Sequence, residues 1–267
     1  MPLSPATGFA GDDFALAGKS DMARRRIVCA LVAVWSSTMV GGPAHAQTRA
    51  VVELFTSQGC SSCPAADKLL GDLASDPSLV TISIPIDYWD FLGWKDTLAE
   101  PRNTIRQKAY ARVRGDGQVY TPQAVVNGTV HALGSDRAAI ERAIAETRTN
   151  GAAPSLPVTL ALADKRIDLA VPEGTVGSAG AEVWLCGLIK AATIAVGRGE
   201  NKGRTITYHN VVRRWVKLGD WTGHAKSWSV PMQGLVGNGI DEAAVLLQGG
   251  TNEKPRAILG AALAALR

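Results

Sequence analysis

The chain has 267 residues and a formal net charge of +4 at neutral pH. Its lysines and arginines are scattered, which excludes the basic stripe of a nucleic-acid-binding surface, so we expect no nucleic-acid partner. Beyond residue 46 no apolar run approaches the roughly twenty residues of a membrane-spanning helix, so we expect no stable membrane insertion.

The N-terminal region 1–46 has the pattern of a secretory signal peptide. Three consecutive arginines precede an apolar run from Ile27 to Val40, and small residues at Ala44 and Ala46 precede the expected cleavage site. Counting from Met22 gives a signal of ordinary length, which makes Met22 an alternative start of the protein. We therefore expect a periplasmic or secreted protein.

Residues 47–148 alternate short β-like runs with helical ones, which is typical of an α/β domain. The Asn127–Gly128 pair between two β-rich runs predicts a hairpin, because both residues accept positive φ. The expected strands are 50–55 and 79–86, the expected hairpin is 123–133, and the expected helices begin at Pro64 or cover 97–113 and 137–147.

The pattern changes after residues 149–157, which are a linker by composition. Residues 158–267 contain a series of β-rich runs separated by glycine-rich turns, with a helical pattern only over 254–266. This spacing predicts an antiparallel sandwich or small barrel. We therefore expect two domains, an α/β domain followed by an all-β sandwich-like domain.

Two cysteines, Cys60 and Cys63, lie between the first expected strand and the first expected helix. A disulfide across two intervening residues closes a very small loop and restricts the unfolded chain little, so it is a poor structural staple. A redox centre explains more, because a helix N-terminus favours the thiolate form of the first cysteine.

A structural zinc site is the third interpretation of this cysteine pair. Such a site needs four ligands, usually a second cysteine pair or two histidines. The remaining candidates in the mature chain are not at paired spacing. They are Cys186, His131, His209 and His224.

Residues 50–147 resemble a thioredoxin-fold domain in two features. Cys-x-x-Cys lies at the strand-to-helix junction, and Thr121-Pro122 lies directly before the expected hairpin, the position of a cis-proline loop in that fold. The stretch TPQAVVNGTVHALGSD is similar to the corresponding stretch of glutaredoxins and periplasmic disulfide oxidoreductases. With ELFTSQGCSSCP followed by RGENKGRTITYHNVV, the chain resembles a family of secreted bacterial proteins of unknown function that join a thioredoxin-like half to a β-rich half.

The resemblance implies roles for individual residues. Cys60 is the attacking thiolate and Cys63 the resolving thiol, and Thr121 and Pro122 line the site where a substrate backbone docks. Glu53 is the candidate for a buried carboxylate that shuttles a proton for Cys63, unless its side chain points to solvent. No cofactor is implied, and the expected partner is a protein or a small thiol or disulfide.

A charged segment punctuated by glycines, VGRGENKGRTITYHN, occupies residues 196–210. Its Arg198 and Arg204 are candidates for substrate binding, because guanidinium groups can hold a carboxylate or phosphate through paired hydrogen bonds. The alternative interpretation is a solvated hairpin.

These features favour an exported thiol–disulfide oxidoreductase-like protein that exchanges disulfides through a Cys-Ser-Ser-Cys centre. Ser61 and Ser62 supply no cation between the cysteines, which leaves the oxidising strength open. The alternative is a non-catalytic thioredoxin-fold binding protein with a structural disulfide, either a Cu(I) carrier or an envelope interaction protein.

Overall fold

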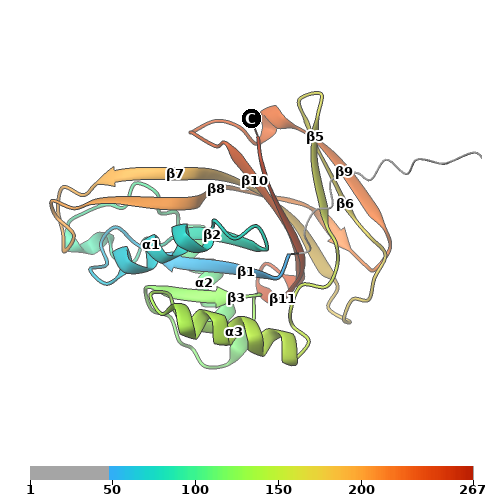
Figure 1. The fold of residues 1–267 in the computed structure, drawn as a ribbon, viewed down its shortest axis with the longest axis horizontal. Helices are drawn as coiled ribbons and strands as arrows, with labels where there is room; N and C mark the ends of the chain where they lie inside the picture. The colour runs from blue at the N-terminus through green and yellow to red at the C-terminus, as the bar shows by residue number, and fades with distance from the viewer. Residues whose placement is uncertain (1–47, 267) are drawn as a thin grey trace, which may run out of the picture. The chain divides into compact units, whose positions relative to one another are not determined.

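The computed structural model describes residues 48–266, so the expected signal peptide and the alternative start at Met22 lie outside the described residues. Within them the fold is mixed α/β, with one large sheet and one small sheet (Figure 1). The helices are α1 (Cys63–Leu73), α2 (Pro101–Arg114) and α3 (Arg137–Thr149), with short 3₁₀ turns η1 (Asp90–Leu92) and η2 (Met232–Gly234). No helix of this part of the chain is long and apolar enough to cross a membrane.

The large sheet has eight strands in the order β11-β10-β7-β8-β2-β1-β3-β4. Its strands are β1 (Ala50–Thr56), β2 (Leu79–Pro85), β3 (Gln123–Val126), β4 (Val130–Leu133), β7 (Ala181–Ala195), β8 (Thr205–Trp221), β10 (Glu242–Thr251) and β11 (Lys254–Ala265). β2 pairs in parallel with β1 and with β8, and the other pairs are antiparallel. The small sheet contains β5 (Thr159–Ala163), β6 (Arg166–Val171) and β9 (Lys226–Pro231).

The local signals for turns and helix starts agree with the observed elements. The hairpin between β3 and β4 is confirmed, with φ of 50° at Asn127 and 73° at Gly128. Pro64 lies in the first turn of α1, where a missing N–H costs nothing. The Asp136 side chain caps α3 by accepting a hydrogen bond from the N–H of Ala139 at 3.0 Å.

The helical pattern over 254–266 is wrong, because this segment forms strand β11. It pairs with β10 in antiparallel register from Glu242↔Ala265 to Thr251↔Lys254. Ile258 is fully buried there, in the same cluster as Leu246 of β10. Alanine favours a helix in isolation, but strand pairing and burial override so weak a preference.

The two halves of the chain meet in the large sheet. The segment predicted as a linker, 149–157, begins at the last residue of α3 and ends before β5, and the division into two domains stays a prediction. The expected β-sandwich shares its strands with the α/β half, because β7, β8, β10 and β11 extend the sheet beyond β2. The junction is narrow: Ser83 pairs with Val211, and the Asn210 amide donates hydrogen bonds to the carbonyl and hydroxyl oxygens of Thr81 at 3.1 and 2.9 Å.

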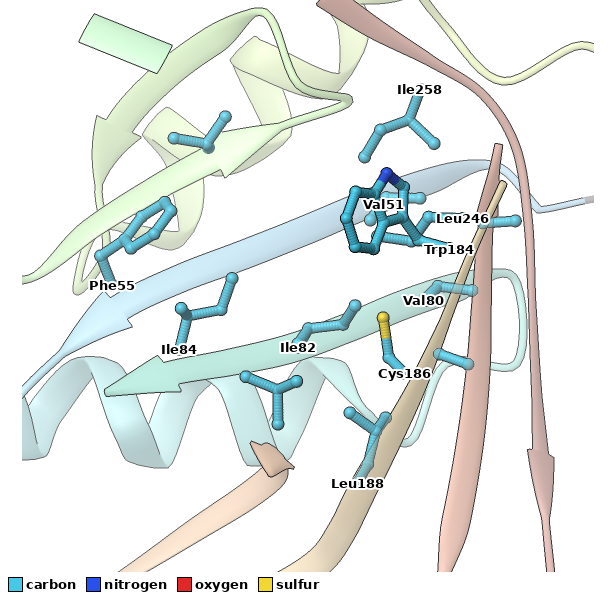
Figure 2. Packing of buried hydrophobic residues seen from close by; sticks show 14 of the residues in the cluster. Val51, Phe55, Val80, Ile82, Ile84, Trp184, Cys186, Leu188, Leu246 and Ile258 are labelled. Atoms are coloured by element: carbon cyan, nitrogen blue, oxygen red, sulfur yellow. The ribbon is translucent and has the colours of Figure 1, made fainter. Parts of the chain in front are cut away.

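Three of the clusters of buried apolar residues hold these layers together. One lies between β1, β3, α1 and α3. A second joins the opposite face of β1 and β2 to α2 and to strands of the C-terminal half. Figure 2 shows this second cluster, in which the Cys186 side chain lies among Ile82, Val80 and Leu188. A third lies between the small sheet and β7, β10 and β11.

β1 positions the candidate site because it is buried on both faces. Successive side chains of a strand point to opposite faces. Val52 and Leu54 pack toward α1 and α3, whereas Val51 and Phe55 pack toward α2. The side chains of β1 therefore alternate between two different interiors, and a short loop connects the end of β1 to the start of α1.

Candidate functional site

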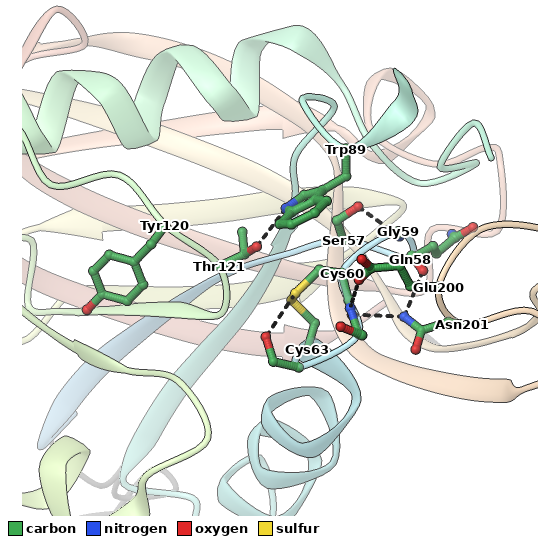
Figure 3. The surroundings of a disulfide bond; sticks show 12 residues. Ser57, Gln58, Gly59, Cys60, Cys63, Trp89, Tyr120, Thr121, Glu200 and Asn201 are labelled. Carbon is green, nitrogen blue, oxygen red and sulfur yellow. Dashed lines mark hydrogen bonds between the residues drawn. A yellow bond between two sulfur atoms is a disulfide. The ribbon is translucent and has the colours of Figure 1, made fainter. Parts of the chain in front are cut away.

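Cys60 and Cys63 lie at the junction of β1 and α1, as predicted, and form a disulfide (Figure 3). The N–H of Cys63 donates to the carbonyl of Cys60 at 3.1 Å, so the turn is hydrogen-bonded internally. α1 begins at Cys63, and Cys60 precedes its first turn. The Ser62 hydroxyl does not cap the helix but lies 3.4 Å from the Cys60 sulfur. Only 1% of Cys60 and 0% of Cys63 is exposed.

The backbone before the disulfide is held by a buried carboxylate, Asp96. It accepts a hydrogen bond from the N–H of Gln58 at 2.7 Å, and its other oxygen accepts from the N–H groups of Leu98 and Ala99. Burial raises the pKa of Asp96, and these three N–H groups oppose that shift. Asp96 therefore serves as a fixed anchor between two loops.

The loop between β7 and β8 reaches the disulfide from the far half of the chain. The fully buried Asn201 amide donates to the carbonyls of Gln58 and Cys60, at 2.9 and 2.8 Å. The Glu200 carboxylate accepts from the N–H of Ser61 at 3.1 Å. Both residues belong to the charged segment noted in the sequence, but nothing in its local pattern distinguishes them from the arginines nearby.

The arginines of this segment lie differently from each other. Arg204 donates to the Asn201 side chain at 3.3 Å and lines a groove of about 540 Å³ with Lys68 of α1 and His209 of β8. Arg198 is exposed in the loop itself. The structure thus brings Arg204 into the surroundings of α1 and leaves Arg198 on the surface.

Trp94 connects the loop between β7 and β8 to Gln58, near the cysteines. Its indole N–H donates to the Gln58 side chain at 2.8 Å. Its ring packs against Gly197, where a Cβ atom would lie 3.0 Å from the ring. The glycine therefore permits the indole to lie against the loop.

Trp89 connects the cysteine loop to the loop that contains Thr121 and Pro122. Its indole N–H donates to the Thr121 hydroxyl at 2.8 Å. A Cβ atom at Gly59 would lie 2.9 Å from the Trp89 Cβ, so only glycine allows this approach. The Thr121–Pro122 peptide is cis, and the Pro122 carbonyl accepts from the N–H of Gly134 at 3.0 Å. Figure 3 shows Trp89 and Thr121 on one side of the disulfide and Asn201 on the other.

Glu53 is fully buried, on the α2 face of β1. Its carboxylate accepts from Arg106 at 2.7 Å and from the Tyr110 hydroxyl at 2.5 Å. Gln248 of β10 accepts from the same guanidinium at 2.6 Å. Both oxygens of Glu53 are thus engaged in a network on the opposite face of β1 from α1, and the structure does not bring Glu53 together with Cys63.

A different carboxylate, Asp67, lies on the cysteine side of β1. It belongs to α1, one turn after Cys63, and only 1% of it is exposed. Burial raises the pKa of Asp67 well above its usual range, the charge of Asp96 adds to that shift, and the Thr56 hydroxyl opposes it. The available sequence signal was an aspartate at helical spacing between Cys63 and Leu70, in a stripe that is otherwise apolar.

Among residues 48–266, no cluster of three or more histidine, cysteine, aspartate or glutamate side chains is placed to hold a metal ion. The third cysteine of this range, Cys186, carries a free thiol in the buried cluster of Figure 2. Burial raises the pKa of this thiol, so it stays protonated at neutral pH.

Comparison with known proteins places the chain in a family. A search of curated proteins gives no match. An X-ray crystal structure of protein AGR_C_4864 from Agrobacterium tumefaciens is similar at 32% sequence identity and a TM-score of 0.74, covering 83% of this chain and 96% of that chain. The family model described as protein of unknown function, DUF1223, matches residues 51–248. The chain therefore belongs to the DUF1223 family.

Proposed function

We propose that this protein is an exported thiol–disulfide exchange protein whose N-terminal half is a thioredoxin-like domain. The observation that carries the proposal is the Cys60–Cys63 disulfide in the turn between a buried strand and a helix. Segments near residues 89–96 and 200–201 contact its loop through hydrogen bonds and close packing, and Thr121 is linked to the loop through Trp89. A disulfide that only crosslinks the chain across two intervening residues does not require so many long-range contacts on its six-residue loop.

The exchange reaction has two steps. The Cys60 thiolate attacks one sulfur of a substrate disulfide, forming a mixed disulfide and releasing the other substrate sulfur as a thiolate. The Cys63 thiolate then attacks the Cys60 sulfur, which forms the Cys60–Cys63 bond and releases the second substrate thiolate. The substrate is reduced by two electrons and the protein is oxidised. The reverse sequence oxidises a substrate dithiol.

The surrounding residues have proposed roles in substrate binding. Thr121 and Pro122 form one side of the site, linked to the cysteine loop through Trp89, and would contact the substrate backbone. Arg204 would hold a carboxylate or phosphate of the substrate in the groove beside α1. Arg198 would contribute from the exposed loop. The signal-like N-terminal region supports a periplasmic or secreted location.

One observation favours the alternative, a binding protein whose cysteine pair is a permanent structural bridge. Cys60 is 1% exposed, and a substrate sulfur must approach this atom along the S–S axis. Exchange therefore requires movement of the loops that cover Cys60, and a bridge requires none.

The test is the reduction potential of the mature protein, measured by equilibration in thiol–disulfide buffers. A value between roughly −120 and −270 mV, the range of exchange catalysts, supports exchange. A value below about −300 mV identifies a structural bridge. In parallel, Cys63→Ser should trap mixed disulfides through Cys60, and Cys60→Ser is the matched control that reveals any trapping by Cys63 or Cys186.

A further inference from the structure

A groove between α1 and the start of β8 adjoins the cysteine turn. Its volume of about 540 Å³ lies within the range of roughly 300–1,000 Å³ that is typical of ligand sites. One wall comes from α1 between Pro64 and Asp72, and the other is formed by 204–207 and His209. Because Pro64 directly follows Cys63, the groove begins beside the disulfide.

The two walls are in close contact at His209. A Cβ atom at Gly71 would lie 2.5 Å from Cδ2 and 2.7 Å from Nε2 of the His209 imidazole. Glycine at this position of α1 therefore allows β8 to lie directly against the helix. The groove is thus held between a helix and a strand that pack on each other.

The β8 wall of the groove is the edge of a strand. The N–H of Val196 donates to the carbonyl of Arg204 at 2.9 Å, and the register with β7 has no shift over 205–209. Hydrogen-bonded and non-hydrogen-bonded pairs alternate in an antiparallel ladder, so Thr205, Thr207 and His209 fall in non-hydrogen-bonded pairs. Their backbone N–H and C=O groups therefore point away from β7.

This edge has no strand beside it where it lines the groove. On the side away from β7, the described part of β8 pairs with another strand only at Val211, which lies opposite Ser83 of β2. Residues 205–209 extend about 15 Å, and the side chains of Thr205 and Thr207 are exposed. An edge of this kind is a template for pairing with another chain, in which main-chain hydrogen bonds supply affinity.

Basic side chains line both walls. Arg204 donates from one guanidinium nitrogen to Asn201 at 3.3 Å, and its other nitrogens have no partner among the described residues. Lys68 lies on the α1 wall with a side chain 78% exposed, and it pairs with Asp72 at 3.0 Å. Two permanent cations against one carboxylate leave the lining positive, which favours an acidic partner.

We propose that this groove binds an extended acidic segment of a protein partner, which pairs with the edge of β8 as an added strand. The backbone of the segment exchanges hydrogen bonds with 205–209, and its carboxylates lie near Arg204 and Lys68. In disulfide exchange this segment is the chain next to the substrate cysteine, a role that rests on the proposed function. Binding itself requires no exchange reaction.

The first experiment measures binding of fluorescein-labelled peptides to the oxidised, full mature protein by fluorescence anisotropy. The probe is a short peptide of alternating glutamate and valine. One control peptide has lysine in place of glutamate, and the other carries an N-methyl group on each backbone nitrogen, which keeps the charges but blocks strand pairing. The acidic probe should bind at least about tenfold more tightly than either control. Binding equal to that of either control peptide overturns the proposal.

Substitutions then test the two walls separately. Thr207→Pro removes an N–H that faces the groove, and proline is tolerated where the N–H of an edge strand points away from its neighbour. It should weaken binding of the acidic probe by about five- to tenfold, whereas the matched control Thr207→Ala keeps the N–H and should change binding by less than about twofold. Lys68→Ala should weaken binding by about two- to fivefold, and Lys108→Ala, at an exposed lysine of α2, should not. Equal binding by Lys68→Ala and Lys108→Ala overturns the proposal even if Thr207→Pro fails to fold.

Analytical ultracentrifugation tests a different occupant of the same edge. A concentration-dependent dimer that Thr207→Pro abolishes would assign the edge to a second copy of the chain and overturn the peptide proposal. If the acidic probe binds as expected but the wild-type protein shows no exchange, only the proposed function fails. If exchange occurs but the probe does not bind, only the role of the groove fails.

Discussion

Asn201 should stabilise the cysteine loop across 141 positions of sequence, and Asn201→Ala tests this directly. The substitution removes the hydrogen bonds of 2.9 and 2.8 Å to the carbonyls of Gln58 and Cys60. The Cys60 carbonyl keeps the N–H of Cys63 as a donor, so Gln58 carries the larger loss. Two hydrogen bonds at about 1 kcal/mol each, plus part of the cost of an unsatisfied buried carbonyl, give a loss of about 2–3 kcal/mol.

The assay is urea and thermal unfolding of the oxidised mature protein. A domain of this size changes Tm by about 2–4 °C per kcal/mol, so Asn201→Ala should lower Tm by about 4–12 °C. Lys202→Ala is the matched control, because Lys202 is the next residue of the same loop and is exposed. A free energy of unfolding within about 0.5 kcal/mol of wild type, the scatter of ordinary surface substitutions, would refute the reasoning.

Three further predictions follow from the packing and charges around β1. Gly59→Ala should destabilise the protein by about 1–3 kcal/mol, because the new Cβ lies 2.9 Å from the Cβ of Trp89; thermal unfolding and tryptophan fluorescence measure this, and an unchanged Tm contradicts it. Glu53→Gln should cost about 3–5 kcal/mol, because it leaves the buried charge of Arg106 without its ion pair; a loss below about 1 kcal/mol in urea unfolding would show that the pair is dispensable. The raised pKa of Asp67 means that the folded state holds a proton the unfolded state has released, so stability should fall as pH rises from the ordinary aspartate value of about 3.9 through the folded value. Asp67→Asn should remove this decline, and parallel curves of Tm against pH for the two proteins would count against the assignment.

The Glu53 prediction also illustrates where reasoning from sequence reaches its limit. A strand pattern states that neighbouring side chains face opposite sides, but not which side meets which helix. The ion pair with Arg106 of α2, whose guanidinium also donates a hydrogen bond to Gln248 of β10, decides that Glu53 faces away from α1. In the sequence, Asp67 is a polar residue at helical spacing between Cys63 and Leu70. Only the structure shows that all three positions are buried.

Local features were predictable because short-range physics controls them. The hairpin at Asn127–Gly128 follows from backbone conformations that few other residues accept, and the start of α1 near Pro64 follows from the helix rule for proline. The placement of Cys60 and Cys63 at a strand-to-helix junction depends on the same local signals.

Long-range contacts determine the rest. The segment 254–266 has the composition of a helix, and only pairing with β10 makes it a strand. Likewise, the approach of Asn201 to the cysteine loop depends on β8 joining β2, through a pairing of residues more than a hundred positions apart. The order of residues along the chain therefore placed the two cysteines and their flanking elements. The folded sheet alone determined which carboxylate and which loop lie beside them, because such contacts are selected by the burial and hydrogen bonding of the whole molecule and leave no local pattern.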